Sequence, residues 1–265
     1  MRESISIIGY GRIGKLLYTC LTNVGYDTIE IITRKDEIKS LNDIILIAVP
    51  DNNIQAVVDE LIHSEVDLRS KTLAHTSGAV GLDVFSDKYL NKTKVGCMHP
   101  CMAVSDTSTS FKGITFDICG DRSFINDIVP IVTDLKAEFM IVDESTKEKL
   151  HLAAVITSNF LITLMGMSQE LFRESNIDHN QLKRTLLPLM QSALKNLENQ
   201  SASNALTGPI ARGDYETIKR HLTLMECNPE LKSAYMLLSK ETLKLISSEL
   251  DEQAQFQLKK ILNES

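Results

Sequence analysis

The stretch Ile-Ser-Ile-Ile-Gly-Tyr-Gly-Arg-Ile-Gly, residues 5–14, is an apolar run that leads directly into three glycines. This spacing is typical of a strand that ends in a tight turn and continues at once as a helix. Gly9 permits the turn, Gly11 lets the backbone approach a pyrophosphate, and Gly14 lets the helix pack closely on the strand. Because free N–H groups at a helix N-terminus bind phosphate, the stretch predicts a dinucleotide site. We expect a strand over 4–8 and a helix over 12–23.

The next apolar run, residues 28–32, ends in Thr33-Arg34-Lys35, about twenty residues after the last glycine of the loop. Enzymes that use NAD place Asp or Glu at this point to bind the ribose 2′-hydroxyl, and no acidic residue stands at 33–35. Arg34 can instead form a charge-assisted bond to a 2′-phosphate, with Thr33 and Lys35 as further donors. We therefore predict NADP(H) as the cofactor. The alternative is that Arg34 and Lys35 are ordinary solvated charges of a loop.

Composition places this chain among globular proteins. With 265 residues, 43% hydrophobic and 24% charged, the chain can form one large domain or two smaller ones. Its net charge of −7 argues against nucleic acid or a membrane surface as the main partner. The five cysteines lack the spacing of metal ligands and indicate reduced thiols in the cytoplasm, so we predict no metal site. A core strand so near the N-terminus predicts that there is no signal peptide.

The first half of the chain alternates predicted strands and helices. Residues 43–49 are apolar at nearly every position, as in a parallel strand covered on both faces, and a helix is expected over 52–62. Further short strands are predicted over 71–74, 94–98, 114–119 and 139–142. The pattern predicts an α/β fold in which a Rossmann-type, doubly wound parallel sheet occupies residues 1–143.

Ligands of such sheets bind outside the carboxyl ends of the strands. The residues predicted to bind the cofactor are therefore Gly9, Tyr10, Gly11, Arg12, Ile13 and Gly14 of the glycine loop, Thr33 and Arg34, and Val49, Pro50, Thr76 and Ser77 after later strands. His99 follows another strand and is predicted to bind the substrate.

From residue 144 onward the pattern changes to helices, expected over roughly 144–175, 178–200, 214–225 and 229–262. Residues 144–265 are predicted to form an all-α domain that binds substrate and forms a homodimer. The segment from His151 to Ser168 has no charged residue over eighteen positions, which is long enough to raise a membrane span. Polar residues interrupt it, and we expect a buried or subunit-interface helix instead.

Several motifs together carry a resemblance to a known group of proteins. These are the glycine loop, Ala48-Val49-Pro50-Asp51, His99-Pro100, the segment from His151 to Phe160, and the long run 205–214, Ala-Leu-Thr-Gly-Pro-Ile-Ala-Arg-Gly-Asp. Over nearly its whole length the chain resembles NADP-dependent reductases that join a Rossmann-like domain to a DUF2520-type helical domain. The group is similar in plan to the 6-phosphogluconate dehydrogenase and pyrroline-5-carboxylate reductase superfamily, and some members resemble PanG-type ketopantoate reductases. One departure is that the superfamily's Lys-x-x-x-Asn pair is absent, because His151 stands four residues after Lys147.

Reduction by a nicotinamide leaves negative charge on the substrate heteroatom, so the site must supply a proton or a strong donor. Lys147 and His151 lie one turn apart on the predicted helix, and Ser158 and Asn159 follow two turns later. We predict that the first two donate the proton and polarise the substrate and that the other two bind it. The alternatives are a solvated lysine, a core histidine bonded to a carbonyl group, and polar residues that join helices.

The run 205–214 contributes Thr207, Arg212 and Asp214 as predicted substrate-binding residues. The alternative for Asp214 is a helix N-cap, and for Arg212 an ion pair with Asp214. The sequence as a whole predicts an NADPH-dependent reductase of a small 2-oxo acid, most concretely ketopantoate. A cyclic imino acid as substrate and a sensor that holds NADPH without turnover remain alternatives.

Overall fold

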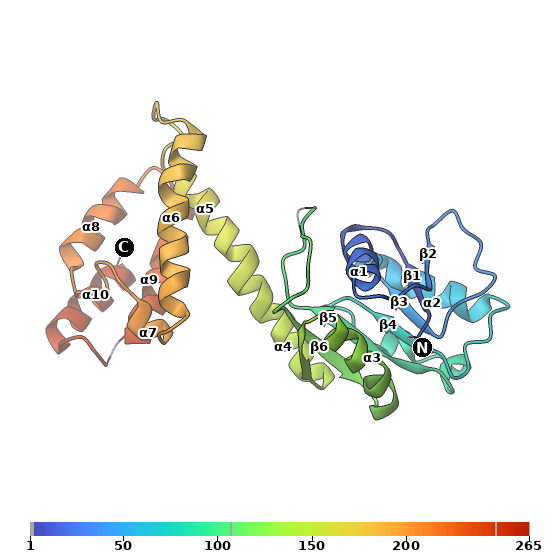
Figure 1. Ribbon diagram of the computed structural model, residues 1–265. Coiled ribbons are helices and arrows are strands. Elements are labelled where there is room, and N and C mark those ends of the chain that lie inside the picture. The colour runs from blue at the N-terminus through green and yellow to red at the C-terminus, as the bar shows by residue number, and fades with distance from the viewer. Residues whose placement is uncertain (1–2, 107, 247, 265) are drawn as a thin grey trace. The chain divides into compact units, whose positions relative to one another are not determined.

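The computed structural model describes residues 3–106, 108–246 and 248–264 (Figure 1). The chain divides into two compact units, Met1–Leu161 and Ile162–Ser265. The first is a sheet covered by helices and the second is helical, so the predicted order of an α/β part followed by an all-α part is confirmed.

A seven-stranded sheet forms the first unit, in the order β2-β1-β3-β4-β5-β6-β7. The strands are β1 Ile5–Ile8, β2 Ile29–Ile32, β3 Ile44–Ile47, β4 Thr72–His75, β5 Lys94–Pro100, β6 Thr115–Gly120 and β7 Glu138–Ile141. All neighbours are parallel except β5 and β6, which are antiparallel. A parallel pairing needs a crossover, usually a helix, and the described residues between β5 and β6 contain none. The sheet is therefore parallel for most of its width, with β6 and β7 running against the other five strands.

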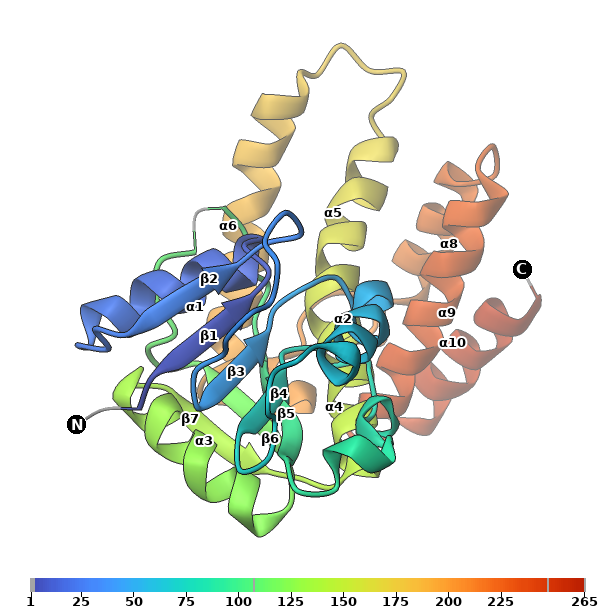
Figure 2. The same ribbon diagram turned by 90° about the vertical axis from the view of Figure 1, so that its right-hand side faces the viewer.

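Helices cover both faces of the sheet (Figure 2). On one face, α1 (Arg12–Asn23) and α3 (Arg122–Asp134) pack against apolar side chains of the strands, among them Met98, Phe116 and Ile118. On the other face lie α2 (Asp51–His63) and the 3₁₀ turn η1 (Leu82–Phe85), followed in the chain by η2 (Lys88–Leu90). Successive side chains of a strand point to opposite faces, so the residues between those on the first face, such as Cys97, His99 and Asp117, point to the second.

One long helical run leaves the sheet after β7. It comprises α4 (Glu144–Ala154), the π-helical segment η3 (Val155–Asn159) and α5 (Phe160–Glu170), and Asp143 caps its start by accepting from the N–H of Thr146. By length and composition alone, the run is long and apolar enough to cross a membrane. An 18-residue window within it has a mean hydropathy of 1.6, and none of that window is buried within the chain. The expected buried helix is therefore not buried by its own chain, although Lys147 near its start is buried and bonds to the loop that follows β4.

The second unit is built from α5 and the helices α6 to α10. Their bounds are α6 His179–Leu197, α7 Ala202–Ala205, α8 Tyr215–Leu224, α9 Pro229–Ile246 and α10 Glu252–Glu264. The core joins α8, α9 and α10 through residues such as Ile218, Leu243 and Leu258. The helix expected over 229–262 is two helices, because Asp251 accepts from the N–H of Ala254 and starts α10 as a new helix.

Candidate active site

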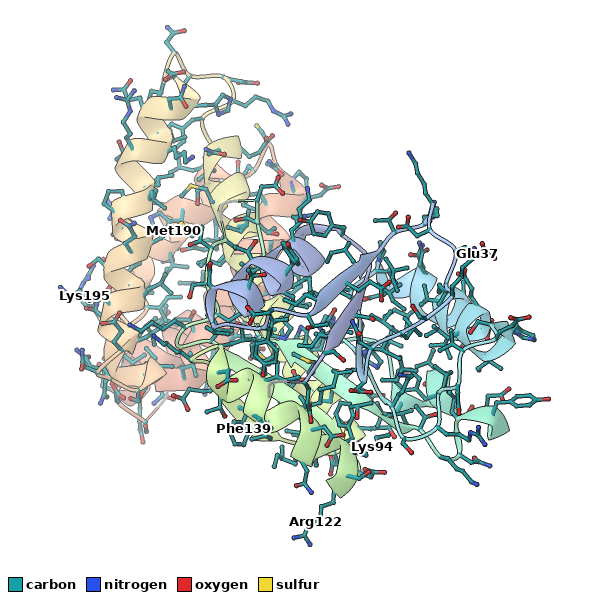
Figure 3. All side chains as sticks on the ribbon, turned by 45° about the vertical axis from the view of Figure 1, so that its right-hand side comes forward. Glu37, Lys94, Arg122, Phe139, Met190 and Lys195 are labelled. Atoms are coloured by element: carbon teal, nitrogen blue, oxygen red, sulfur yellow. The ribbon has the colours of Figure 1, made fainter. Side chains whose placement is uncertain are left out.

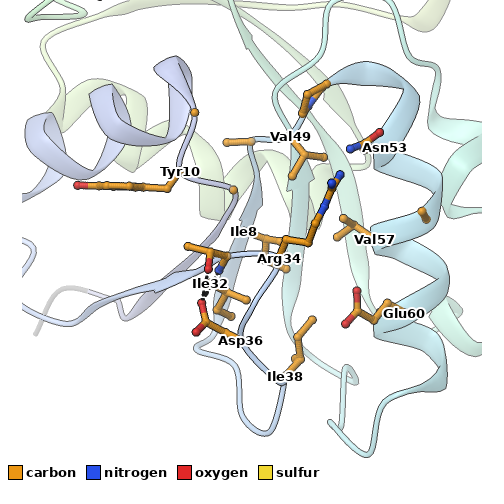
Figure 4. Close-up of a pocket in the computed structure, with 16 residues that line it drawn as sticks. Ile8, Tyr10, Ile32, Arg34, Asp36, Ile38, Val49, Asn53, Val57 and Glu60 are labelled. Atoms are coloured by element: carbon orange, nitrogen blue, oxygen red, sulfur yellow. Dashed lines mark hydrogen bonds between the residues drawn. The ribbon is translucent and has the colours of Figure 1, made fainter.

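A pocket of about 600 Å³ lies beside the glycine loop and the carboxyl ends of β1, β2 and β3 (Figure 4). This volume is within the range of small-molecule and cofactor sites. Of the predicted cofactor residues, Gly9, Tyr10, Gly11, Thr33, Arg34, Val49 and Pro50 line the pocket. Arg12, Ile13, Gly14, Thr76 and Ser77 are not among the residues that line it.

The three glycines of the loop differ in what a side chain would meet. Gly9 has a φ of +103°, and a Cβ there would lie 2.5 Å from the Ala48 carbonyl oxygen. A Cβ on Gly14 would overlap the Gly9 carbonyl group, whereas a Cβ on Gly11 would meet nothing within 4 Å. Gly9 and Gly14 are thus required by the fold itself, while Gly11 leaves open space in front of the loop.

Helix α1 begins at this open space without a side-chain cap and without an acidic residue in its first turn. By contrast, Asp121, Asp143, Asp178 and Asp214 each cap a later helix by accepting from backbone N–H groups. The positive end of α1 is therefore not neutralised by a capping side chain, and an anion can accept hydrogen bonds there.

The turn after β2 presents Arg34 at the pocket. The N–H and Oγ1 of Thr33 both donate to Asp36 Oδ2 at 2.7 Å, which closes the turn and lowers the pKa of Asp36. Figure 4 shows the Arg34 side chain extending from this turn towards Asn53 and Val49. Asp36 is held by Thr33, so this acidic group of the pocket is already engaged while the exposed guanidinium of Arg34 reaches across the pocket.

Three polar residues of the pocket, Asp36, Asn53 and Glu60, were not predicted from the sequence. Asn53 and Glu60 are seven residues apart, and Val57, between them, lines the pocket as well. This spacing places all three on one face of α2. The helical period over 52–62 was the signal from which they could have been found.

Beyond the pocket, the carboxyl ends of β4 and β5 gather a second group of polar side chains. His99 and Asp117 are directly opposed in the antiparallel β5–β6 pair, and His99 Nδ1 lies 2.7 Å from Asp117 Oδ2. The Cys101 thiol donates to the same carboxylate oxygen at 3.3 Å. Asp117 is only 1% exposed, and its other oxygen has no hydrogen-bond partner among the described residues. An ionised carboxylate can only accept, so this pairing fixes the proton of His99 on Nδ1 when the ring is neutral.

His151 of α4 approaches His99 from the other side, and the two ring centres are 6.0 Å apart. A Cβ on Gly78 would lie 2.6 Å from His151 Nδ1 and 2.9 Å from His99 Nε2, so both nitrogens converge beside this glycine. His151 Nδ1 is buried without a partner among the described side chains, which rules out a bond from this nitrogen to a carbonyl group there. Two imidazole nitrogens thus lie against the same glycine.

Lys147 lies one turn before His151 and is 1% exposed. Its Nζ donates to the carbonyl oxygens of Gly78 and Val80 at 2.8 and 2.6 Å. Glu144 of the same helix accepts from the N–H of Leu82. The alternative of a solvated lysine is therefore wrong, because Lys147 is buried and ties α4 to the loop that follows β4.

Burial also changes the titration of neighbouring groups. It lowers the pKa of His75 to about 4, and the charge of Lys147 acts in the same direction, so His75 is neutral at pH 7. Burial raises the pKa of Cys97 and Cys119, and raises that of Cys101 to about 11. These three cysteines are thiols at neutral pH, and they are not activated nucleophiles.

The remaining predicted residues lie on three other segments. Ser158 and Asn159 are in the π-helical segment η3, a rare geometry that is frequent at functional sites. Ser77 is buried, and its Oγ accepts from the N–H groups of Ala79 and Val80. Thr207, Arg212 and Asp214 belong to the second unit.

Asp214 caps α8 by accepting from Thr217 N and Oγ1, which confirms the N-cap interpretation. Arg212 is exposed, and the structure records no ion pair between it and Asp214. The assignment of Thr207, Arg212 and Asp214 to the substrate stays a prediction.

Comparison with protein families gives two adjacent matches. A model of the Rossmann-like domain matches residues 26–102, and a model of DUF2520, a domain of unknown function, matches residues 114–242. The resemblance that the sequence motifs carry is thus confirmed. The DUF2520 match starts at β6, so this family includes the last strands of the sheet and the long helical run as well as most of the helices beyond them. No curated protein gave a match.

Several solved structures are similar to this chain over most of its length. A Bacteroides fragilis protein proposed to be an NADP oxidoreductase is 20% identical, with a TM-score of 0.77, over 92% of this chain and 98% of that one. A Thermotoga maritima protein is 21% identical, with a TM-score of 0.72, over 92% and 99%. An imine reductase from Myxococcus stipitatus in complex with NADP⁺ is 16% identical, with a TM-score of 0.65, over 98% and 99%. At these identities the likeness shows the fold.

Proposed function

We propose that this chain, which joins a Rossmann-like domain to a DUF2520 domain, is an NADPH-dependent reductase of a small carbonyl compound. The observation that carries the proposal is the pairing of His99 with buried Asp117, next to His151. His99 lies near the carboxyl end of β5, in the same sheet as β1, β2 and β3, whose carboxyl ends line the pocket. The most concrete substrate is a 2-oxo acid such as ketopantoate, which would be reduced to pantoate.

The residues of the pocket fit the proposed cofactor. The uncapped start of α1 and the open space at Gly11 suit a pyrophosphate, and Arg34 suits a 2′-phosphate. Sheet order supports the direction of binding: β3, β4 and β5 are consecutive neighbours, so a dinucleotide extended from the pocket reaches the ends of β4 and β5. When bound, the nicotinamide supplies a hydride to the substrate carbon.

The chain's own residues then handle the proton. As the carbonyl carbon becomes a C–H carbon, its oxygen gains negative charge and takes a proton to become a hydroxyl group. We assign this proton to His99 Nε2, because Asp117 holds the opposite ring nitrogen and stabilises the charged imidazolium beforehand. His151 Nδ1 lies against the same glycine, Gly78, and is assigned a hydrogen bond to the same substrate oxygen.

We assign Lys147 a positioning role. Two of its three N–H bonds are used by Gly78 and Val80, so it fixes the loop against which both imidazoles converge. Its buried positive charge also favours an anion in this space. Ser158 and Asn159 are the first unit's candidates to hold a substrate carboxylate.

Imine reduction is a second candidate. The same arrangement can protonate an imine nitrogen as hydride reaches its carbon, and a solved structure of similar fold is an imine reductase in complex with NADP⁺. A sensor that binds NADPH without turnover is the third. The pairing of His99 with Asp117 supports an enzyme, because a binding protein needs no histidine aligned by a buried carboxylate.

We also propose that the protein is cytoplasmic and forms a homodimer through its helical part. An apolar stripe on α6, formed by Leu187, Met190, Leu194 and Leu197, lies on one face of the helix. The three leucines are at least 40% exposed in the chain. A second copy that covers this stripe would remove it from water.

The test of the proposal is a panel of 2-oxo acids and cyclic imines incubated with purified protein and NADPH or NADH. We expect loss of the reduced-nicotinamide absorbance with NADPH and one of the substrates.

Arg34→Asp should weaken NADPH binding at least 10-fold in calorimetry, since each charged hydrogen bond contributes about 1.5–3 kcal/mol. Equal affinity for NADH and NADPH in the wild type would overturn the cofactor assignment, and binding without any turnover would favour the sensor.

A further inference from the structure

The pairing of β5 with β6 brings three metal-binding side chains together on one face of the sheet. His99 Nδ1, Cys101 Sγ and an oxygen of Asp117 lie within 4.8 Å of one another. His99 lies near the end of β5, Cys101 follows directly after the end of that strand, and Asp117 stands opposite His99 on β6. The sequence spacing does not indicate this group, because the antiparallel pairing creates it.

The charge of Asp117 is incompletely compensated in this group. Its carboxylate is 1% exposed, its Oδ2 accepts only from a histidine and a thiol in the described structure, and its Oδ1 accepts from nothing. A buried carboxylate is costly unless a positive group pairs with it. A proton on His99 is one such group, and a cation held between the three side chains is another.

We propose that His99, Cys101 and Asp117 bind one divalent transition-metal ion of the zinc class. Imidazole and thiolate are ligands that zinc and cobalt prefer, whereas magnesium and calcium prefer oxygen alone. In a tetrahedral site the ligand atoms are roughly 3.3–3.8 Å apart. The Cys101–Asp117 distance of 3.3 Å meets this range already, and the His99–Asp117 pair, now at 2.7 Å, must open by somewhat less than 1 Å.

Binding changes the protons of the site in a defined way. Cys101 loses its thiol proton to solvent and becomes a thiolate ligand, and the proton of neutral His99 moves from Nδ1 to Nε2. The ion with one thiolate and one carboxylate then has no net charge, which suits a buried position. Three protein ligands leave a fourth position for water or a small ligand.

The test uses Co²⁺ as the probe on the full chain, freed of metal by a chelator and kept without cofactor. We expect one Co²⁺ per chain with a thiolate-to-cobalt charge-transfer band. Cys101→Ser should abolish the band and weaken binding at least about 10-fold, since even indirect partners of metal ligands cost that much. The matched control is Cys227→Ser, which removes an exposed cysteine and should leave the band unchanged.

Asp117→Asn and His99→Gln give two further variants in case Cys101→Ser does not fold. Loss of the band in Cys227→Ser, its persistence in a folded Cys101→Ser protein, or no cobalt binding by the wild type would overturn the proposal. The metal site and the proposed reduction use His99 in different states, because a metal-bound Nδ1 cannot carry the proton that pairs with Asp117. A chain that binds cobalt without consuming NADPH supports the metal site and rejects the reductase, and the opposite result does the reverse.

Discussion

His99 is the residue on which the proposed chemistry depends most. His99→Gln keeps a polar side chain of similar length but cannot donate a proton to the substrate. We expect kcat to fall by about 10²- to 10⁴-fold while the NADPH dissociation constant stays nearly unchanged, because the proton is needed only in the transition state. Steady-state kinetics and calorimetry on folded protein measure both quantities.

Asp117→Asn is the companion variant that separates catalysis from packing. It keeps the shape of the pair but no longer stabilises an imidazolium, so the pH profile of kcat should shift as well as its size. A profile of unchanged shape in this variant, or more than half of the wild-type turnover in His99→Gln, would move the acid to another residue.

His75 should make stability depend on pH. Its pKa is about 4 in the folded protein and about 6.5 when unfolded, so between these values the unfolded chain binds more protons. The contribution of His75 is therefore fully present above about pH 6.5 and is lost as the pH falls. We expect it to lower the free energy of unfolding by roughly 2 kcal/mol between pH 7 and pH 5.

Urea unfolding at several pH values measures this term. His75→Gln should show a shallower decline towards acid than the wild type, whereas His179→Gln, which changes an exposed histidine, should not. Parallel curves for the wild type and His75→Gln would mean that His75 is not held neutral.

At the scale of elements, the turn between β1 and α1 separates the needs of the fold from those of the ligand. A Cβ on Gly14 would overlap the backbone of Gly9, but a Cβ on Gly11 has free space. Gly11→Ala should therefore leave the melting temperature of the free protein unchanged and weaken NADPH binding. Gly14→Ala should lower the melting temperature even without cofactor. Thermal unfolding with and without NADPH distinguishes them, and unimpaired NADPH binding by Gly11→Ala would contradict a pyrophosphate at this loop.

The elements also show how far sequence reasoning reaches. The strands from β1 to β5 and the glycine loop were predictable because each is a local apolar run bounded by turn residues. The direction of β6 was not, since it depends on a connection without a crossover helix. The pairing of His99 with Asp117, eighteen residues apart, depends on that direction and was missed for the same reason. The burial of Lys147 was missed because it comes from contact with the distant loop 78–80.

At the scale of the whole molecule, exposed apolar surface points to assembly. Figure 3 labels Met190, which belongs to the apolar stripe of α6. It also labels Phe139 of the edge strand β7, and the Phe139 side chain is 42% exposed. We expect light scattering to give twice the chain mass of 29.6 kDa. Leu194→Lys should shift the protein towards the monomer, because it places a charge in the apolar stripe of α6. Ser192→Lys, on the opposite face of the helix, is the matched control, and dissociation by both variants or by neither would reject this interface.

The central claim, that the chain transfers a hydride from NADPH, is tested most directly by isotope transfer. The protein is incubated with NADPH carrying deuterium at the C4 position of the nicotinamide and with the substrate that the panel identifies. Mass spectrometry of the product then counts the deuterium atoms at the reduced carbon. We predict one deuterium atom per product molecule from one of the two C4 positions and none from the other. Product without deuterium from either position, or no product with any 2-oxo acid or imine, would contradict the account.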